Sequence, residues 1–281
     1  MNYLVTGATG GFGGYALDFL KEMVPIATIS ALVRSEEKGI ELKEKGFNVK
    51  IGDYADASSM KEALQGIDRL LFVSGAPGNR QVEHRHVVEA AKEAGVSYIA
   101  YTSFAGADKA TSPLAADHLF TEKLIEESGI THTFLRNNWY LENEMPIIGA
   151  ALNSGKFVYA AGNGKTGWAL KREYAEVAAK AVSGTEYPST LELSGTPVTY
   201  EVLASALKSA TGKELDLVGA EDHVFVESLV ADGMPQPVAE MFLSFQHDIK
   251  NGSLDVVSSD FEQALGKPLI SLKDGLKELL H

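Results

Sequence analysis

The segment Gly7-Ala8-Thr9-Gly10-Gly11-Phe12-Gly13 directly follows the apolar run Tyr3–Thr6 and opens a helix-length amphipathic run. This order of strand, glycine-rich turn and helix predicts a dinucleotide-binding unit. Gly7 would let the chain leave the strand sharply, Gly10 would admit a diphosphate, and Gly13 would bring helix and sheet close together. Amides at the helix start would then face the anion, which the helix dipole also favours.

The first half of the chain repeats this alternation of short apolar runs and helix-length runs. Ser59–Glu62 matches a capping box that opens a short helix, which Gly66 ends. Strands this apolar are expected to be buried on both faces, as in a parallel, doubly wound, Rossmann-like α/β sheet. The predicted strands are Tyr3–Thr6, Thr28–Val33, Phe47–Ile51, Arg69–Val73, Ser97–Thr102 and Thr131–Leu135.

Beyond Arg136 the alternation loosens, and from Thr199 onward helical patterns dominate. We therefore predict a Rossmann NADP(H)-binding domain over residues 1–195 and a smaller, mainly helical substrate lobe over residues 196–281. Residues 137–156 are expected to contribute to the pocket between them. The predicted helices of the second lobe are Thr199–Ala210, Glu221–Ala231, Val238–Asn251, Asp260–Leu265 and Leu272–Leu280.

Composition narrows the classes of partner. The chain has 281 residues, a net charge of −13 and no cysteine. The negative charge disfavours nucleic acid and anionic membranes, so an anionic cofactor must be held by local amides and a few cations. The absence of cysteine excludes disulfides and zinc–thiolate sites. Without a basic leader or a run of about 18 apolar residues, we expect a cytoplasmic protein.

The residue after the second predicted strand indicates the cofactor. An NAD-selective site has an acid there, whereas this chain has Arg34 followed by Ser35. A guanidinium can bind a 2′-phosphate through two parallel hydrogen bonds, so NADPH is favoured over NADH. A solvated surface arginine is the alternative, and the adjacent Glu36 and Glu37 leave the strictness of the preference open.

Two further strand ends are candidate cofactor contacts. Asp53 follows the third strand, where a side chain could meet the adenine. Ser74-Gly75-Ala76 follows the fourth, where small residues would let the backbone pass the ribose. Both segments could equally be ordinary turns.

These motifs, together with Tyr101-Thr102-Ser103, Glu122-Lys123 and the run Leu135–Asn143, resemble the NmrA-like atypical short-chain dehydrogenases. Within that group the likeness is greatest to bacterial NAD(P)H:quinone oxidoreductases of type 2, with triphenylmethane reductases nearby. The resemblance implies NADPH across Gly7–Gly13, with Ser103 and Lys123 also at the cofactor. It places Asn138, Trp139, Tyr140, Leu141, Glu142 and Asn143 beside the nicotinamide, with Tyr174 facing it.

One departure from the broader family bears on the reaction. The usual Tyr-x-x-x-Lys would place tyrosine at position 119, where this chain has Leu119. Reduction of an ordinary ketone is therefore in doubt, whereas a quinone yields a stabilised anion that needs little acid help. We predict an NADPH-dependent quinone reductase, with Lys123 orienting the nicotinamide ribose and supplying positive charge. A redox-sensing regulator that binds NADP(H) without turnover is the alternative.

The substrate site is expected at Asn137, Trp139, Tyr140 and Tyr174, which could hold a flat aromatic or quinone-like ring. The histidines are scattered without a ligand pattern, so no metal site is predicted. Ala161–Thr166 resembles the end of a P-loop but has Tyr159 where the first glycine is required. Apolar helix faces in the second lobe leave a homodimer open.

Overall fold

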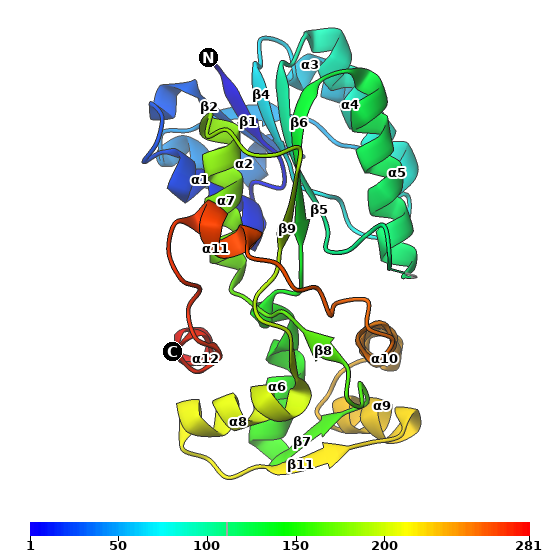
Figure 1. Ribbon diagram of the computed structural model, residues 1–281. Helices are drawn as coiled ribbons and strands as arrows, with labels where there is room; N and C mark the ends of the chain where they lie inside the picture. Colours follow the sequence, from blue (N-terminus) through cyan, green and yellow to red (C-terminus); the bar gives the residue numbers. More distant parts are fainter. Residues whose placement is uncertain (111) are drawn as a thin grey trace.

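A seven-stranded parallel sheet forms the larger lobe of the molecule (Figure 1). The computed structural model describes residues 1–110 and 112–281. The strand order is β3-β2-β1-β4-β5-β6-β9, so the direction of winding reverses between β1 and β4. Ligands of doubly wound sheets bind at this switch point, outside the carboxyl ends of the strands. The strands are β1 (Tyr3–Val5), β2 (Ile29–Val33), β3 (Asn48–Ile51), β4 (Arg69–Phe72), β5 (Tyr98–Phe104), β6 (Thr131–Asn137) and β9 (Thr190–Leu193).

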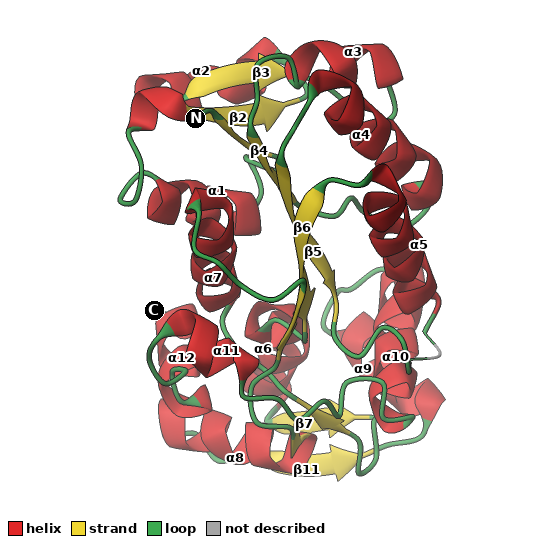
Figure 2. Cartoon of the chain, turned by 45° about the horizontal axis from the view of Figure 1, so that its top comes forward, coloured by secondary structure: helices red, strands yellow, loops and turns green. Residues whose placement is uncertain are grey.

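Helices cover both faces of this sheet (Figures 1 and 2). One face carries α1 (Gly11–Leu20), α2 (Glu36–Glu44), α7 (Lys171–Ser183) and α11 (Asp260–Leu265). The other carries α3 (Ala57–Ala63), α4 (Arg80–Ala94) and α5 (Pro113–Ser128). Because both faces are covered, strands such as β2 are buried at every residue. The predicted Rossmann-like fold is confirmed, and all six predicted strands are present.

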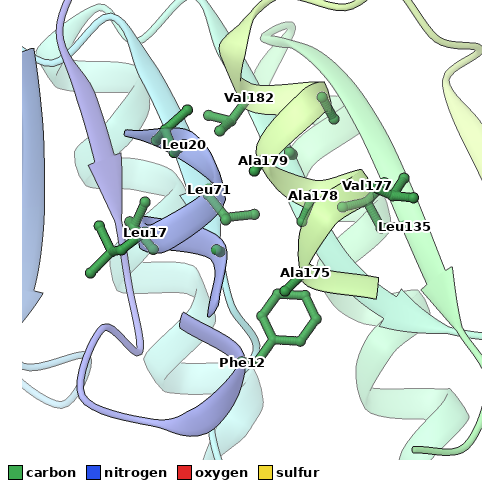
Figure 3. Packing of buried hydrophobic residues seen from close by; sticks show 14 of the residues in the cluster. Phe12, Leu17, Leu20, Leu71, Leu135, Ala175, Val177, Ala178, Ala179 and Val182 are labelled. Carbon is green, nitrogen blue, oxygen red and sulfur yellow. The ribbon is translucent and has the colours of Figure 1, made fainter. Parts of the chain in front are cut away.

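The contact between α1 and α7 fixes the position of the glycine-rich turn. Leu17 and Leu20 of α1 pack against small side chains of α7, including Ala178 and Ala179 (Figure 3). Alanines on α7 leave room for the two helices to approach closely. Phe12, in the first turn of α1, is 7% exposed and lies at the end of this core nearest the sheet's carboxyl edge. The helix that follows the turn is thus held from two sides.

The smaller lobe is built from several stretches of the chain, which are separated in the sequence by stretches that belong to the larger lobe. β7 (Lys156–Tyr159) pairs with β11 (Asp216–Gly219), and β8 (Lys165–Thr166) pairs with β10 (Val198–Thr199). The boundary predicted at residue 195 therefore does not describe the lobes, because residues 141–170 pack with the smaller lobe and α11 packs on the larger one. The helices of the smaller lobe are α6 (Met145–Ser154), α8 (Tyr200–Thr211), α9 (Asp222–Ala231), α10 (Gln236–Lys250) and α12 (Leu272–Leu280), with the 3-10 turn η2 (Leu141–Glu144) leading into α6.

Close backbone crossings hold the lobes together. A Cβ added to Gly167 would lie 2.5 Å from the backbone oxygen of Gly195, so only glycine fits at that crossing. Asn138 lies just beyond β6, and its Nδ2 donates to Ser194 Oγ at 2.8 Å and to Leu254 O at 3.0 Å. One buried amide therefore joins three segments that are far apart in the sequence.

The glycines near residue 164 serve packing. A Cβ on Gly164 would lie 2.3 Å from Ile249 O, at the end of α10. The loop that resembles a P-loop thus lies against a helix end in the smaller lobe. Its glycine is explained by this close approach.

Candidate functional site

The glycine-rich turn lies at the carboxyl edge of the sheet, between β1 and α1. Gly7 has a φ of 60°, and its carbonyl oxygen accepts from Gly10 N at 2.9 Å. A Cβ on Gly13 would lie 2.2 Å from Gly7 O, closer than any side chain allows. Gly7 and Gly13 therefore have the roles that the sequence predicts. Since α1 begins at Gly11, its first-turn amides have no acceptor within the helix.

A cleft of about 560 Å³ opens from this turn across the ends of β1, β2 and β4. Its volume lies in the range typical of cofactor and ligand sites. The cleft brings together residues that are far apart in the sequence and were singled out as cofactor contacts: Gly7, Thr9, Gly10, Arg34, Asp53, Ser74, Gly75 and Ala76.

Two cations line the cleft at the end of β2. Arg34 is exposed there, as expected, and Lys38 lies one helical turn further along. Ser35 is the N-cap of α2, and its Oγ accepts from Lys38 N at 3.4 Å. The carboxylate of Glu36 lies 3.5 Å from Lys43 Nζ. Lys38 was not predicted, although a cation four residues after Arg34, at the start of a helix, is a recognisable sequence signal.

Tyr54 closes the floor of the cleft. Its hydroxyl donates to Val73 O at 2.8 Å and contacts Thr6 Oγ1. Burial raises the pKa of Tyr54, so the phenol stays protonated. The neighbouring Asp53 lines the cleft, and its Oδ1 accepts from Ala55 N at 3.0 Å. Tyr54 thus ties the ends of β1 and β4, while Asp53 borders the open space.

The last residue of β6 and the segment that follows it form a second group of polar and aromatic side chains. Asn137 Nδ2 donates to Tyr140 Oη at 3.0 Å, whereas Asn137 Oδ1 is buried without a hydrogen-bond partner. Phe12 lies near the Tyr140 ring, with the centroids 6.0 Å apart. This segment therefore lies next to the glycine-rich turn. An unpartnered buried oxygen is costly and indicates a missing donor.

Lys171 brings a third cation to the turn. It is the first residue of α7, and its Nζ lies 5.5 Å from the centroid of the Tyr140 ring. A Cβ on Gly11 would lie 3.7 Å from that same Nζ. Its backbone N donates to both carboxylate oxygens of Glu142 at 2.9 Å. No sequence signal pointed to Lys171, because α7 begins far along the chain from the turn.

The other residues of the segment are occupied in structural contacts. Leu141 is 1% exposed and packs in the core of the smaller lobe. The Trp139 ring packs edge-on against Phe245, with centroids 5.0 Å apart. Asn143 N donates to Tyr140 O at 3.0 Å in a tight turn. The side chain of Asn138 is used in joining the lobes, so only its backbone could meet a ligand.

Arg136 gathers three carboxylates on the opposite face of the sheet. It contacts Glu122 at 2.8 Å, Glu192 at 3.0 Å and Asp108 at 2.9 Å, and the bonds to Glu122 and Glu192 raise the pKa of its guanidinium. Arg136, Asp108 and Glu192 line a polar cavity of about 370 Å³. Across residues 1–110 and 112–281, no group of histidine and acidic side chains is arranged to hold a metal ion.

Comparison with known proteins identifies the family. A family model described as NAD(P)H-binding matches residues 7–182. The chain belongs to this NAD(P)H-binding family. It is 36% identical to quinone oxidoreductase 2 of Escherichia coli strain K12, over 99% of this chain and 98% of that protein. It is 29% identical to an NAD(P)H azoreductase of Xenophilus azovorans, over 90% and 91% of the two chains.

Solved structures agree with this assignment. The NADPH complex of the Escherichia coli quinone oxidoreductase superposes with a TM-score of 0.93 and 36% identity, covering 99% of this chain and 100% of that one. The NADP(H) complex of a Citrobacter sp. triphenylmethane reductase gives 0.94 and 34%, covering 99% of both. This member of the NAD(P)H-binding family is therefore an oxidoreductase with NAD(P)H as its cofactor. No helix in the described part of the chain is long and apolar enough to cross a membrane.

Two side chains expected at the nicotinamide lie elsewhere. Lys123 is 73% exposed and lies 3.7 Å from Glu127 on the outer face of α5. Successive helical residues point about 100° apart, and it is the preceding Glu122 that faces the sheet, where it accepts from Ser103 Oγ at 2.6 Å. The electrostatic role predicted for Lys123 needs a side chain in the cleft, and this one is outside it.

Tyr174 is fully buried within the larger lobe rather than at a ligand surface. Its ring packs on Phe261 and Tyr140, with centroid distances of 4.4 and 5.1 Å, and its hydroxyl donates to Gly167 O at 3.4 Å. It therefore supports Tyr140 from behind. Direct contact between Tyr174 and a substrate, as the sequence predicts, does not fit this position.

Proposed function

We propose that this protein is an NADPH-dependent reductase that delivers hydride to a quinone or a similar flat, conjugated acceptor. The observation that carries the proposal is a cleft lined by the predicted cofactor contacts, combined with Leu119 in place of the tyrosine that is usual in the broader short-chain dehydrogenase family. Leu119 is half-buried and packs against the apolar core of the smaller lobe. No phenol is available there to protonate a ketone, whereas the anion formed from a quinone is stabilised and can take its proton from water.

The cleft suits an adenine dinucleotide with a 2′-phosphate. The first-turn amides of α1 would bind the diphosphate, and Arg34 and Lys38 would bind the 2′-phosphate. Asp53 borders the space for the adenosine, and Ser74–Ala76 borders the space for the ribose. Both cations lie near the end of β2, where an NAD-selective site has an acidic residue. This position supports NADPH over NADH.

Asn137 supports a place for the nicotinamide. Its partnerless Oδ1 requires a donor, and a carboxamide N–H of the nicotinamide would supply one. When bound, NADPH supplies the hydride. The residues of the chain orient the ring: Tyr140 and Phe12 form an aromatic wall beside the glycine-rich turn.

We assign the positive charge of the site to Lys171, in place of the exposed Lys123. Its Nζ lies beside the glycine-rich turn and over the Tyr140 ring. An ammonium at that position stabilises negative charge that develops on the acceptor oxygen. The proton then comes from water, so no buried acid is required.

Turnover of the purified protein tests the proposal. NADPH is mixed with a benzoquinone, and the absorbance of the reduced cofactor is followed, with NADH in a parallel series. We expect oxidation above the uncatalysed background and a higher rate with NADPH. If a panel of quinones and dyes gives none, the enzymatic proposal fails. NADPH bound without turnover would favour the redox-sensing regulator instead.

The setting of the protein is also a proposal. A net charge of −13 supports a protein that binds small molecules rather than nucleic acid, and we propose that it acts in the cytoplasm. Measurement of the molar mass in solution distinguishes a homodimer from a monomer.

A further inference from the structure

A cluster of buried polar side chains lies beneath the loop that follows β4. Arg80 and His84 come from α4, and His118 and Thr121 come from α5; each is at most 6% exposed. Burying such groups costs free energy unless they find hydrogen-bond partners. The hydride transfer proposed above uses none of them, so their partners are informative.

His84 binds the amide of Gly75. Gly75 N donates to His84 Nε2 at 3.0 Å, and His84 Nδ1 lies 2.8 Å from Thr121 Oγ1. Because an amide can only donate, Nε2 must be the acceptor, and the imidazole proton must lie on Nδ1. Thr121 Oγ1 passes its own hydrogen to Asp117 O at 3.0 Å. The hydrogen bonds therefore all point the same way, from Gly75 through His84 and Thr121 to Asp117 O, and this order requires a neutral imidazole. Burial and the nearby Arg80 lower the pKa of His84 to about 3, which keeps it neutral.

Arg80 binds the carbonyl of the same residue. Its Nε and Nη2 donate to Gly75 O at 3.0 and 2.6 Å. Its Nη1 lies 3.1 Å from His118 Nε2, and His118 Nδ1 lies 2.8 Å from Tyr101 Oη. Both polar groups of Gly75 are therefore held by side chains that are themselves fixed by further bonds.

The neighbouring residue is held in the same way. Ser74 N donates to Thr102 Oγ1 at 2.8 Å. Ser74, Gly75 and Ala76 line the cleft, yet none of them belongs to a helix or strand. A loop without such support would have to be ordered when a ligand binds, and that ordering weakens affinity. Buried side chains beneath it remove this cost in advance.

We propose that His84 and Arg80 are positioning residues for the cofactor, because they hold the Ser74–Ala76 loop in the shape that receives NADPH. They touch no reacting atom and act through Gly75. The inference rests on the cofactor site proposed above. It predicts that their loss weakens NADPH binding selectively, since the acceptor lies against other elements.

The first experiment compares His84→Leu with His84→Gln by calorimetric titration with NADPH. Leucine has a similar volume but no acceptor for Gly75 N–H, whereas the glutamine amide oxygen can take that hydrogen bond. We expect NADPH binding about tenfold weaker or worse for His84→Leu, and within about threefold of the parent protein for His84→Gln. His132→Leu is the matched control, since His132 lies at the opposite end of the sheet, and its Kd should not change.

Steady-state kinetics separate positioning from general damage. For His84→Leu and for Arg80→Met, the KM for NADPH should rise while the KM for the quinone stays within about twofold of the parent value. If His84→Leu does not fold, Thr121→Val replaces it, with Thr121→Ser as the variant that keeps the hydroxyl. Parental NADPH affinity in folded His84→Leu or Thr121→Val, or equal losses in the glutamine and leucine variants, would overturn the inference. The parent protein is titrated first, so failure of the cofactor site itself is recognised separately.

Discussion

Gly13→Ala is the sharpest test of the cofactor turn. The added Cβ would lie 2.2 Å from Gly7 O, 2.6 Å from Gly7 C and 3.0 Å from Ala8 Cα. All three are backbone atoms, so no side chain can rotate away. Either the turn or the start of α1 must move by about an ångström to relieve the overlap.

Such a shift displaces the amides that would bind the diphosphate. Each hydrogen bond to a charged group contributes about 1.5–3 kcal/mol, so loss of two weakens NADPH binding by at least about 100-fold. Overpacking also lowers the free energy of unfolding by about 1–3 kcal/mol. Gly14→Ala is the matched control on the same helix, because its Cβ would meet only Ala8 O, at 3.9 Å. It should bind NADPH normally and gain up to about 1 kcal/mol of stability.

Calorimetric titration with NADPH and thermal unfolding of both variants decide the matter. Gly13→Ala should retain its far-UV circular dichroism and lose measurable binding. If folded Gly13→Ala binds NADPH within about threefold of the parent, or if Gly14→Ala loses as much affinity, the role assigned to this close approach is wrong.

Three further outcomes follow. Arg34→Ala and Lys38→Ala should each weaken NADPH binding by about 1.5–3 kcal/mol and leave NADH binding nearly unchanged; equal losses for both nucleotides in titrations would contradict the 2′-phosphate assignment. Lys171→Met should lower kcat for a benzoquinone by about tenfold or more, against Lys123→Met, which should leave it unchanged. Burial raises the pKa of Glu144 to about 7, so its stabilising contribution is present below the unfolded pKa and is lost as the pH rises through 7. In denaturant unfolding, the free energy of unfolding of Glu144→Gln should therefore be higher than that of the parent by about 2–3 kcal/mol at pH 8 and by under about 1 kcal/mol at pH 5. An equal gain at both pH values would refute this.

The larger lobe could be predicted because its signals are local. Each buried strand is a short apolar run, and the glycine spacing is set by contacts within one strand–turn–helix unit. Local signals failed at α3, where Asp56 rather than Ser59 is the N-cap and accepts from Ser58 N and Ser59 N. Asp56 and Ser59 are both residue types that commonly cap a helix, and the helix begins after the earlier of the two.

The smaller lobe could not be predicted to the same extent because its pairings are distant. β8 and β10 have two residues each, too few for a period to appear. β7 pairs with β11 across some 60 intervening positions, and a hydrophobic pattern does not name its partner. The helix Met145–Ser154 was missed as well, since it is apolar on several sides and lacks a clear stripe.

The site shows the same division. Arg34 was predicted at the cofactor because the residue at the end of the second strand of such a sheet contacts the adenosine ribose, and the structure places it in the cleft. Lys123 was inferred from its spacing to a tyrosine that this chain lacks. Spacing fixes a position along a helix but not its rotation, and α5 turns Glu122 rather than Lys123 toward the sheet.

The topology also explains how so acidic a chain can hold an anion. In a parallel sheet each crossover helix starts where a strand ends, so helix N-termini gather at the carboxyl edge. Three of them meet around the cleft: α1 at Gly11, α2 with Lys38 in its first turns, and α7 at Lys171, whose Nζ reaches the start of α1. Partial positive charge from the dipoles adds to the two lysines there, and both effects are strongest within one turn of the helix end. The fold therefore places helix N-termini and cations at the cleft, beside the carboxylates of Asp53 and Glu83 that also line it, so a chain with a net charge of −13 still has local positive groups for a phosphorylated cofactor.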